Sequence, residues 1–492
     1  MIPNLIESNN FFSQNFDQGI RPSSNKEAAI LLRFLKHLRI SNLFSQLSDK
    51  RQQSKTNYSN TSLSFWAFLT LLFRQGSKNG FRTTLGGLSC KKRKAMASLL
   101  MTDDTLPHSS TVDDYLRHLD AEQLNNVLVG IFQRMQKTKV FYNHVSILMP
   151  DNRFLLGCDG FHTHTYSKPH SVDELGNNIC PYCLPRRRNK GTPQEEVYWV
   201  HVFVTFVIIF KGGLKIPIYI YPLKACQVKE CLSDEAFKQE CELKATHAVL
   251  PIIKNQLPHT AFTFCGDGLY ANEPTILLLN SLFFEYLIVR KEKSLKCLGK
   301  HCDELSKTEL YQKSYVFCAC EKNGRKTITR QAQWFNNEMV GKEAGTNVLR
   351  FEETIVNHEG VLFDHYKGEW LCSKRLHKGN CFEQAKQARS RWEHEDFHNT
   401  CKRRGFEAKH DMARKDPNLC LIWKLMLFIA FSVFELFRCL KLVQDACGRR
   451  SWMKFSRDLL HQLVYEDWGE ISSSSILQKE KVQFRFCFEK SS

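Results

Sequence analysis

The feature of this sequence that most constrains its fold is a change of pattern near residue 150. From that point the chain alternates between strand-like and helix-like apolar segments. The expected elements, in order, are strands at 154–159, 199–210 and 214–223, a helix at 232–254, a strand at 261–267, a helix at 273–282 and a strand at 283–289. The turn Lys211-Gly212-Gly213 predicts that the second and third strands form a hairpin. Three meandering strands followed by alternating helix and strand are typical of an α/β domain.

The segments that precede and interrupt this pattern have a different composition. Residues 1–23 are rich in Asn, Ser and Gln, which predicts a loose arm. Residues 24–140 carry apolar side chains at helical spacing and many basic residues, which predicts a compact, all-helical region. Residues 161–198 contain few apolar runs and many Gly, Pro, Arg and Cys, so we expect a long loop or a small insertion there.

The second half of the chain returns to helices after a region of mixed strands and loops at 290–375. One helix is expected over 382–404 and an apolar helix over 419–440, followed by a C-terminal region at 441–492 that is Ser-rich and polar after about residue 465. The uncharged centre of the apolar segment, Leu425–Phe434, is too short to cross a hydrocarbon core that needs about 20 residues. A buried core helix is therefore expected, and association with a membrane is not.

The charge balance and the cysteines narrow the class of protein. Lys and Arg number 69 against 51 Asp and Glu, which gives a net charge of +18. Such a surplus favours a polyanionic partner, most often nucleic acid, although a basic housekeeping protein has the same balance. The 19 cysteines come without a visible signal peptide, which predicts free thiols in a reducing cytoplasm.

Two aspartates follow predicted strands and precede glycines, in Cys158-Asp159-Gly160 and Gly266-Asp267-Gly268. In open α/β sheets, ligands bind beyond the ends of strands. Neighbouring carboxylates repel each other unless they share a proton or hold a cation, and hard oxygen ligands suit Mg²⁺. The alternative for each aspartate is an ordinary turn residue.

A third acid lies in the helix predicted at 382–404. Arg391, Glu395 and Lys402 are spaced by four and seven residues, which places them within an arc of about 40° on one helix face. Glu393 lies about 160° away on the same wheel and should point elsewhere. An exposed face with i,i+4 ion pairs has the same pattern, so the helix alone does not decide its role.

Taken together, these residues resemble the insertion-sequence transposases of the DDE type, which have a ribonuclease H-like core. The closest likeness is to the cut-and-paste group with a Tyr-(2)-Arg-(3)-Glu-(6)-Lys signature, whose spacing Arg391, Glu395 and Lys402 match. The segments around Asp159 and Asp267 are similar to the family's two aspartate motifs, and the resemblance covers about residues 25 to 440. The tyrosine position of the signature holds Ala388, so that residue's grip on the DNA end, and the hairpin intermediate it would support, are not carried over.

The resemblance implies a division of the chain into domains. It implies a ribonuclease H-like mixed sheet formed by residues 150–289 and 376–440, with a β-rich insertion at 290–375. It also implies that residues 24–140 form a helical DNA-binding domain. We expect that domain to bind DNA on its own and to recognise the ends of the element, because helices in the major groove are the usual readers of base edges.

The resemblance also implies a reaction and its partners. Asp159, Asp267 and Glu395 would hold two Mg²⁺ ions, or Mn²⁺ in their place, about 3.5–4 Å apart. These ions would support cleavage at the element's ends and strand transfer into target DNA, while Arg391 and Lys402 hold phosphates. The implied partners are terminal inverted repeats and target DNA, bound by a homodimer near the nucleoid of a prokaryotic cytoplasm. A stand-alone nuclease and a non-catalytic DNA-binding derivative remain as alternatives.

Two further motifs lie in the segment 161–198. Cys180 and Cys183 form a CxxC pair, which is half of a structural zinc site if histidines such as His162, His164 or His170 complete it. Free cysteines in a loop are the alternative. The basic run Arg186, Arg187 and Arg188 follows directly and predicts contact with DNA phosphates, with a solvated loop as the alternative. The run Lys91–Lys94 allows the same two interpretations.

Overall fold

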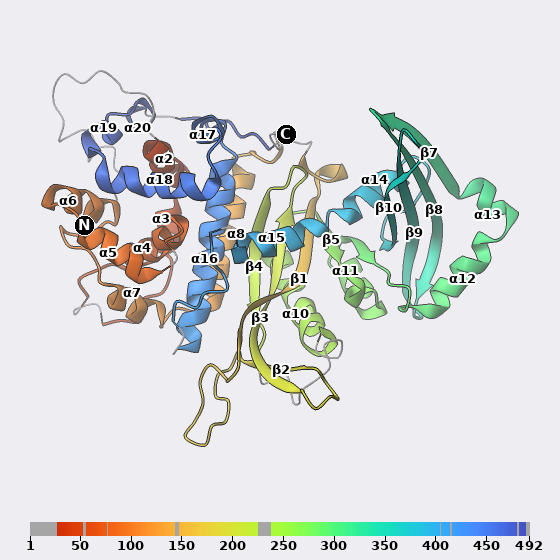
Figure 1. Cartoon of the computed structure of the whole chain (residues 1–492), viewed down its shortest axis with the longest axis horizontal. Coiled ribbons are helices and arrows are strands. Elements are labelled where there is room, and N and C mark those ends of the chain that lie inside the picture. The colour runs from red at the N-terminus through yellow and green to blue at the C-terminus, as the bar shows by residue number, and fades with distance from the viewer. Residues whose placement is uncertain are drawn as a thin grey trace.

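The computed structural model describes most of the chain as helices and strands around one mixed sheet (Figure 1). The described residues are 27–52, 56–75, 77–142, 147–224, 238–403, 405–413, 416–479 and 482–488. The predicted arm at 1–23 and the start of the helix predicted at 232–254 lie outside them. The predicted mixed α/β class is confirmed.

The sheet has ten strands, which run in the order β2-β3-β1-β5-β6-β10-β9-β8-β7, with β4 paired to β3. Their bounds are β1 Phe154–Tyr166, β2 Leu184–Arg188, β3 Glu196–Ile209, β4 Lys215–Pro222, β5 Phe262–Gly266, β6 Glu285–Val289, β7 Val316–Asn323, β8 Lys326–Val340, β9 Ala344–Asn357 and β10 Leu362–Cys372. β3 pairs antiparallel with β1 and β4, which confirms the predicted hairpin, whereas β5 and β6 run parallel to β1. β10 pairs antiparallel with β6, so the four strands β7–β10 continue the same sheet.

Helices cover both faces of the central strands. The helices between β4 and α14 are the π-helical turn η5 Lys238–Leu243, α10 Lys244–Gln256, the 3₁₀ turn η6 Gly268–Tyr270, α11 Glu273–Ser281, α12 Lys296–Ser306 and α13 Glu309–Ser314. On one face, the Cys158 thiol lies 3.3 Å from the Thr246 hydroxyl of α10. On the opposite face, an added side chain at Gly157 would meet His394 of α15, Trp392–Arg403. The two residues are neighbours in β1 and point to opposite sides, as strand geometry requires.

The N-terminal and C-terminal helices form one layer beside the sheet (Figure 1). Their bounds are α2 Glu27–His37, α3 Ile40–Phe44, α4 Asn60–Leu72, α5 Lys78–Gly86, α6 Cys90–Leu99, α7 Ser109–Leu116, α8 Ala121–Lys137, the 3₁₀ turn η3 Pro150–Asn152, α16 Pro417–Arg438, α17 Lys441–Cys447, α18 Trp452–Tyr465, α19 Trp468–Ser472 and α20 Ser475–Gln478. α16 packs against α4 and α8, and α18 packs against α2 and α6. The region 24–140 therefore shares its core with helices from the end of the chain.

The edge strand β4 is covered by α8. Asn125 of α8 accepts a hydrogen bond from the Ile220 amide at 3.0 Å and donates one to the Ile220 carbonyl at 3.1 Å. Such pairing satisfies backbone groups that an open sheet edge would leave exposed. α8 thus fixes the helical layer to the sheet.

α16 is the only described helix that is long and apolar enough, by these two measures, to cross a membrane, and its apolar stretch is wholly enclosed by the protein. Its charged residues are paired inside the fold. Lys424 Nζ lies 3.0 Å from Asp411 Oδ1, and Arg438 Nε lies 2.7 Å from Glu435 Oε1. These contacts agree with the expected core helix.

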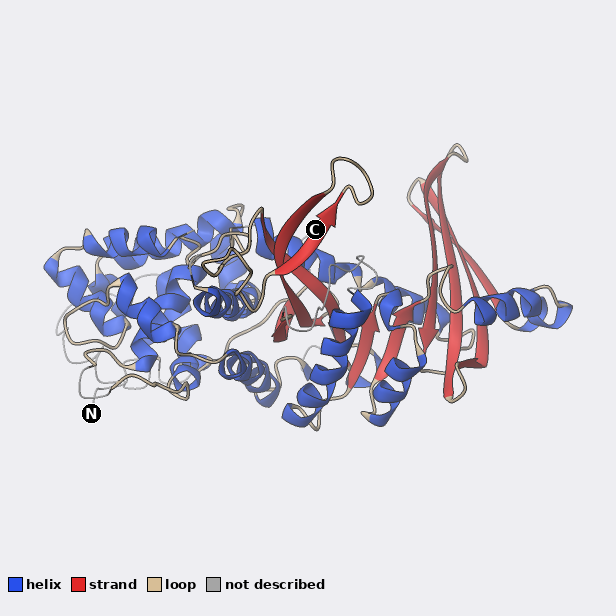
Figure 2. Cartoon of the chain, turned by 90° about the horizontal axis from the view of Figure 1, so that it is seen from below, coloured by secondary structure: helices blue, strands red, loops and turns tan. Residues whose placement is uncertain are grey.

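Three sequence predictions need correction. The segment 161–198 contains strand β2 and the second half of β1, because both pair with a long β3. The helix predicted at 382–404 is two helices, α14 Cys381–Arg389 and α15. The region 290–375 includes α12 and α13 as well as strands (Figure 2).

Candidate functional site

The register between β1 and β5 places the two predicted aspartates side by side. The parallel ladder pairs Leu155 with Thr263 and Gly157 with Cys265. Continued by two residues, this register brings Asp159, within β1, level with Asp267, the residue directly after the end of β5. Side chains two residues apart in a strand share a face, so both aspartates lie on the face of Gly157 and Cys265. Strand register therefore brings together two acids that are 108 residues apart in sequence.

α14 and α15 cover that face. The Cys265 thiol donates to the Ala388 carbonyl of α14 at 3.8 Å. The Thr205 hydroxyl of β3 lies 2.8 Å from His394 Nε2 and 3.0 Å from His398 Nε2, both on α15. The same hydroxyl donates to the Asp159 carbonyl at 3.2 Å, and Thr205 pairs with Asp159 in the ladder. Buried hydrogen bonds thus dock α15 directly over the strand that carries Asp159.

The docking histidines are held neutral. Burial lowers the pKa of His394 to about 3, and the nearby Arg391 and Lys215 act in the same direction. Burial also lowers the pKa of His398 well below its usual value, with His394 next to it. Neutral imidazoles do not add positive charge beneath the site, so its cations are Arg391, Lys402 and Lys291.

The close approach of α15 depends on the glycine in β1. A Cβ added to Gly157 would lie 2.6 Å from His394 Nδ1 and 2.8 Å from Ile209 Cδ1. We expect Gly157→Ala to lower the free energy of unfolding by about 1–3 kcal/mol through overpacking against α15. Denaturant titration of the full chain measures this effect.

Gly345→Ala in β9 is the matched control for this substitution. No heavy atom outside its neighbours lies within 4 Å of the added Cβ, so we expect stability close to that of the unsubstituted protein. Equal stability of the two variants would show that α15 does not need the glycine.

The Arg-Glu-Lys set is preserved despite the break in the helix. Arg391 lies in the two-residue gap between α14 and α15, and its Nη2 is 3.3 Å from Glu395 Oε1. Lys402 lies with its Nζ 4.7 Å from the centre of the Phe161 ring on β1. Burial and the nearby Lys409 lower the pKa of Lys402, and the Asp159 carboxylate opposes that shift, so this acid lies within electrostatic range of the ammonium group. The structure therefore pairs Arg391 with Glu395 and leaves Lys402 in the electrostatic field of Asp159.

Glu393 points in another direction, as predicted. Its carboxylate lies 2.8 Å from Lys215 Nζ of β4, and Asp396 binds the same ammonium group at 2.6 Å. Glu395 instead faces Arg391 and is 40% exposed. The helical wheel distinguished these two glutamates correctly.

The acids of the site are partly exposed and face cations. Asp267 Oδ1 accepts the Leu269 amide at 2.9 Å, and its Oδ2 lies 3.6 Å from Lys291 Nζ. Asp159 Oδ1 accepts the Gly160 amide at 2.8 Å. Among the described residues, the three acids do not form a set whose ligand atoms lie within 4.8 Å of one another. Asp159 and Asp267 lie on the face that α14 and α15 cover, and the Glu395 carboxylate of α15 is engaged by Arg391.

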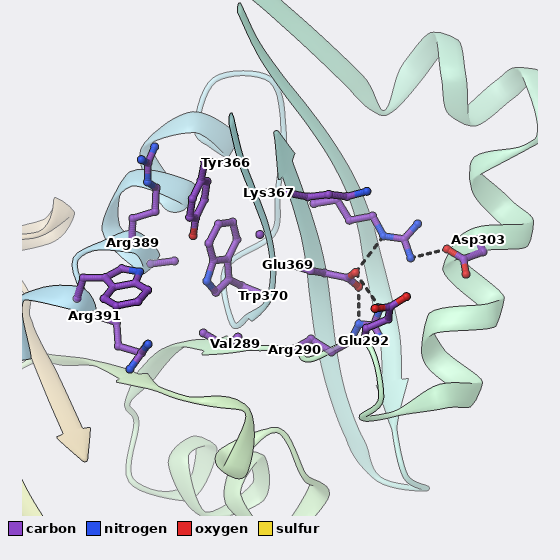
Figure 3. Close-up of a pocket in the computed structure, with 14 residues that line it drawn as sticks. Val289, Arg290, Glu292, Asp303, Tyr366, Lys367, Glu369, Trp370, Arg389 and Arg391 are labelled. Atoms are coloured by element: carbon purple, nitrogen blue, oxygen red, sulfur yellow. Dashed lines mark hydrogen bonds and ion pairs between the residues drawn. The ribbon is translucent and has the colours of Figure 1, made fainter. Parts of the chain in front are cut away.

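A pocket of ≈ 640 Å³ opens between this face and the strands β6 and β10 (Figure 3). Tyr366 and Trp370 lie side by side on β10, with ring centroids 6.3 Å apart, and the Arg389 guanidinium lies 4.2 Å from the Tyr366 ring centroid. Its lining comprises Val289, Arg290, Glu292, Asp303, Arg350, Tyr366, Lys367, Gly368, Glu369, Trp370, Ala388, Arg389, Arg391 and Trp392. Arg391 thus belongs both to the acidic site and to an aromatic, cation-rich pocket.

The basic run of β2 is only partly exposed. Arg186 is buried, which corrects the expectation that all three arginines lie at a DNA-facing surface. Arg187 Nη1 lies 2.8 Å from Glu195 Oε1, and the Arg188 guanidinium lies 4.7 Å from the Tyr198 ring centroid. Contact with phosphate remains a prediction for Arg187 and Arg188.

The CxxC pair meets a histidine that the sequence analysis missed. His201 Nε2 lies 3.4 Å from Cys180 Sγ and 3.2 Å from Cys183 Sγ. The one sequence signal was a histidine inside the otherwise apolar run 199–210. Of the predicted histidines, His170 reaches Cys180, His162 lies near His398 instead, and the side chain of His164 lies outside the described part of the chain.

A scan of protein-family models and a search of curated protein sequences both find no match to this chain.

Proposed function

We propose that this protein is a DNA transposase of the DDE type, with Asp159, Asp267 and Glu395 as its catalytic carboxylates. The observation that carries the proposal is the parallel register of β1 with β5, which, continued by two residues, brings Asp159 level with Asp267 just past the end of β5. The helix that covers this face presents Glu395 between Arg391 and Lys402. Two strand-end acids and a helix-borne acid with flanking cations are the arrangement that the resemblance implies.

The fold supports the same proposal. Three antiparallel strands, β4-β3-β1, are followed by two strands parallel to β1, with helices on both faces. This layout agrees with a ribonuclease H-like core. Strands β7–β10 are inserted between β6 and α14, where a β-rich insertion is expected, and they join the core sheet through β10.

The donor set fits divalent magnesium. Asp159, Asp267 and Glu395 offer hard carboxylate oxygens on one face, and each is partly exposed. Asp267 and Glu395 each have a cation as a neighbour, Lys291 and Arg391, which a divalent ion bound between the acids would displace or join. Bound Mg²⁺ would supply Lewis acidity, which activates water or a 3′-hydroxyl and stabilises the leaving oxygen of the phosphodiester.

The surrounding side chains would position the DNA. Arg391 presents a guanidinium fork at the edge of the pocket, suited to two oxygens of one phosphate. Lys402 presents a point charge beside Asp159. Trp392, which is 57% exposed, lines the pocket and offers a face on which a base could stack, whereas Trp370 is buried. The protein's own part is thus to hold phosphates and to orient the strand across the acids.

The proposal is tested with the full chain and labelled duplexes that carry the DNA sequence on either side of its gene. Transposition predicts Mg²⁺-dependent cleavage at a terminal repeat and covalent joining of the new 3′ end to a second DNA. Cleavage without joining would support the nuclease alternative. Binding without cleavage would support the non-catalytic alternative.

DNA binding should depend on the exposed cations of α6. Lys91 and Lys94 are 77% and 60% exposed, and Arg93 lies between them. We expect replacement of these three by alanine to weaken binding and to flatten the plot of log affinity against log salt concentration. Each lost phosphate contact should reduce the slope by about 0.9. Gel-shift titration of the full chain at several salt concentrations measures this.

The control replaces Lys322, Arg325 and Lys326, which lie around the turn between β7 and β8 at the far end of the molecule (Figure 1). The same loss of charge there should leave the slope for end binding unchanged. Equal slopes for both triple variants would remove α6 from the binding surface.

A further inference from the structure

Four potential metal ligands meet where β3 extends below the central sheet towards β2 (Figure 1). His201 Nε2 on β3 lies 3.4 Å from Cys180 Sγ and 3.2 Å from Cys183 Sγ. His170 Nδ1, in the segment after β1, lies 3.9 Å from Cys180 Sγ. The ligand atoms of His170, Cys180 and His201 all lie within 4.8 Å of one another, the one set of three His, Cys, Asp or Glu side chains that does so among the described residues.

These separations suit tetrahedral zinc. Zinc binds cysteine sulfur at about 2.3 Å and histidine nitrogen at about 2.0–2.1 Å, so a sulfur and a nitrogen on one tetrahedral ion lie about 3.5 Å apart. The two distances from His201 to the sulfurs are close to this value, and the third, from His170, needs a shift of a few tenths of an ångström. The two-residue spacing of the cysteines is also that of structural zinc sites.

The site is buried and has unmet polar capacity. Cys180, Cys183 and His201 are each at most 3% exposed. His170 Nε2 is buried and has no hydrogen-bond partner among the described residues. Nearby Cys420 on α16 is occupied elsewhere, because its thiol donates to Asp411 at 3.5 Å. Two thiols and two imidazoles are thus enclosed together, where water cannot satisfy them freely.

The Cys183 sulfur accepts a hydrogen bond from the His170 amide at 3.1 Å. Thiolate is the form in which cysteine binds metals, and a backbone donor to the sulfur is the outer contact expected around a bound one.

We propose that His170, Cys180, Cys183 and His201 bind one Zn²⁺ ion in a closed, four-coordinate structural site. Four protein ligands leave no open position for a substrate, which distinguishes this site from a catalytic one. The zinc site is built from nitrogen and sulfur, separately from the carboxylates of the proposed active site, and it does not depend on the proposed function.

The ion would hold a long connection in place. It would tie the segment after β1 and the CxxC loop to β3, and Cys183 is followed directly by β2, Leu184–Arg188. The exposed arginines of β2, Arg187 and Arg188, would thereby be held at a fixed position beside the core. Zinc binding would thus stabilise the folded conformation of a segment that has few apolar side chains to bury.

The test is the metal content of the full chain, purified without a metal-affinity tag from cells grown with zinc. We expect about one zinc per chain by mass spectrometry, retained through dialysis. X-ray absorption at the zinc edge should show two sulfur and two nitrogen neighbours. Cobalt in place of zinc should give the intense visible bands of a tetrahedral site and a thiolate charge-transfer band.

Variants locate the metal within the chain. Cys180→Ser and His201→Asn should lose most of the zinc, whereas Cys302→Ser, which removes another buried thiol on α12, should keep it. If the site variants do not fold, the neighbour count from X-ray absorption of the unsubstituted protein decides. Zinc far below one per chain, a metal surrounded only by oxygen, or a Cys180–Cys183 disulfide in the native protein would overturn the proposal.

Discussion

Replacing Glu395 by glutamine is expected to reduce DNA cleavage by about a thousandfold or more, with binding to DNA retained. The variant keeps the shape of the side chain and removes one carboxylate from the proposed metal site. Several kcal/mol of transition-state stabilisation are at stake when a metal ligand is lost, and about 4 kcal/mol corresponds to a thousandfold. Single-turnover cleavage of a labelled element end, in excess enzyme, measures the loss.

Glu393→Gln is the matched control, because Glu393 lies in the same helix two residues away. Its carboxylate is 30% exposed, and it binds Lys215, which Asp396 also binds. Loss of one of two partners should cost little stability, and cleavage should stay near that of the unsubstituted protein. A large loss in the Glu393 variant with normal cleavage in the Glu395 variant would reverse the assignment.

Replacing Asp267 by asparagine is expected to separate cleavage from binding. Asparagine retains an oxygen that can accept the Leu269 amide, so the turn after β5 should survive. Cleavage should fall below detection because one of the three proposed metal-binding carboxylates is missing. Affinity for DNA comes mainly from phosphate contacts elsewhere and should be retained. Gel shift and cleavage are measured on the same duplex.

Two results would contradict this account of Asp267. Cleavage in Mg²⁺ at the normal rate would remove the residue from the reaction. Loss of binding in a variant that is soluble and has the same melting temperature as the unsubstituted protein would make Asp267 a structural residue. Asp159→Asn is expected to behave as Asp267→Asn does, because the two residues occupy equivalent levels of adjacent strands.

The central strands were predictable from sequence because their signals are local. β3 and β4 are runs of Val, Ile and Phe separated by Lys211-Gly212-Gly213, and the hairpin forms there. The direction of Glu393 relative to Glu395 follows from helix periodicity, because residues two positions apart point to nearly opposite sides of a helix. The position of Asp159 next to Asp267 could not be predicted from either segment alone, since it depends on the register between the two strands.

The break between α14 and α15 had no local signal, because neither proline nor glycine lies there. The turn is closed by backbone hydrogen bonds over three residues, from Arg391 to the Ala388 carbonyl and from His394 to the Arg391 carbonyl. The Cys265 thiol binds the same Ala388 carbonyl from the sheet. A contact between distant segments thus accompanies this change of direction.

The role of His201 as a proposed metal ligand was likewise not predictable from the local sequence. His201 lies in the buried part of β3, 18 residues after Cys183, and only the pairing of β3 with β1 and β2 brings it to the CxxC loop. The histidines nearer in sequence were the more obvious candidates, and of these only His170 reaches the cysteines.

The boundaries of the helical region could also not be predicted from the local sequence pattern. The predicted domain at 24–140 shares its core with α16 and α18, and the Ser456 hydroxyl of α18 donates to the Leu72 carbonyl at 2.8 Å. A fragment ending at residue 140 would expose that shared apolar surface. Recognition of element ends by this region is therefore best measured in the full chain, as proposed for α6.

The most direct measurement of the central claim is the position of Mn²⁺, located by anomalous scattering in crystals of the full chain with a cleaved element end. The account predicts two peaks about 3.5–4 Å apart, in contact with the carboxylates of Asp159, Asp267 and Glu395. It would be contradicted by Mn²⁺ at Glu393, or by no peak at these three acids in crystals that bind Mn²⁺ elsewhere.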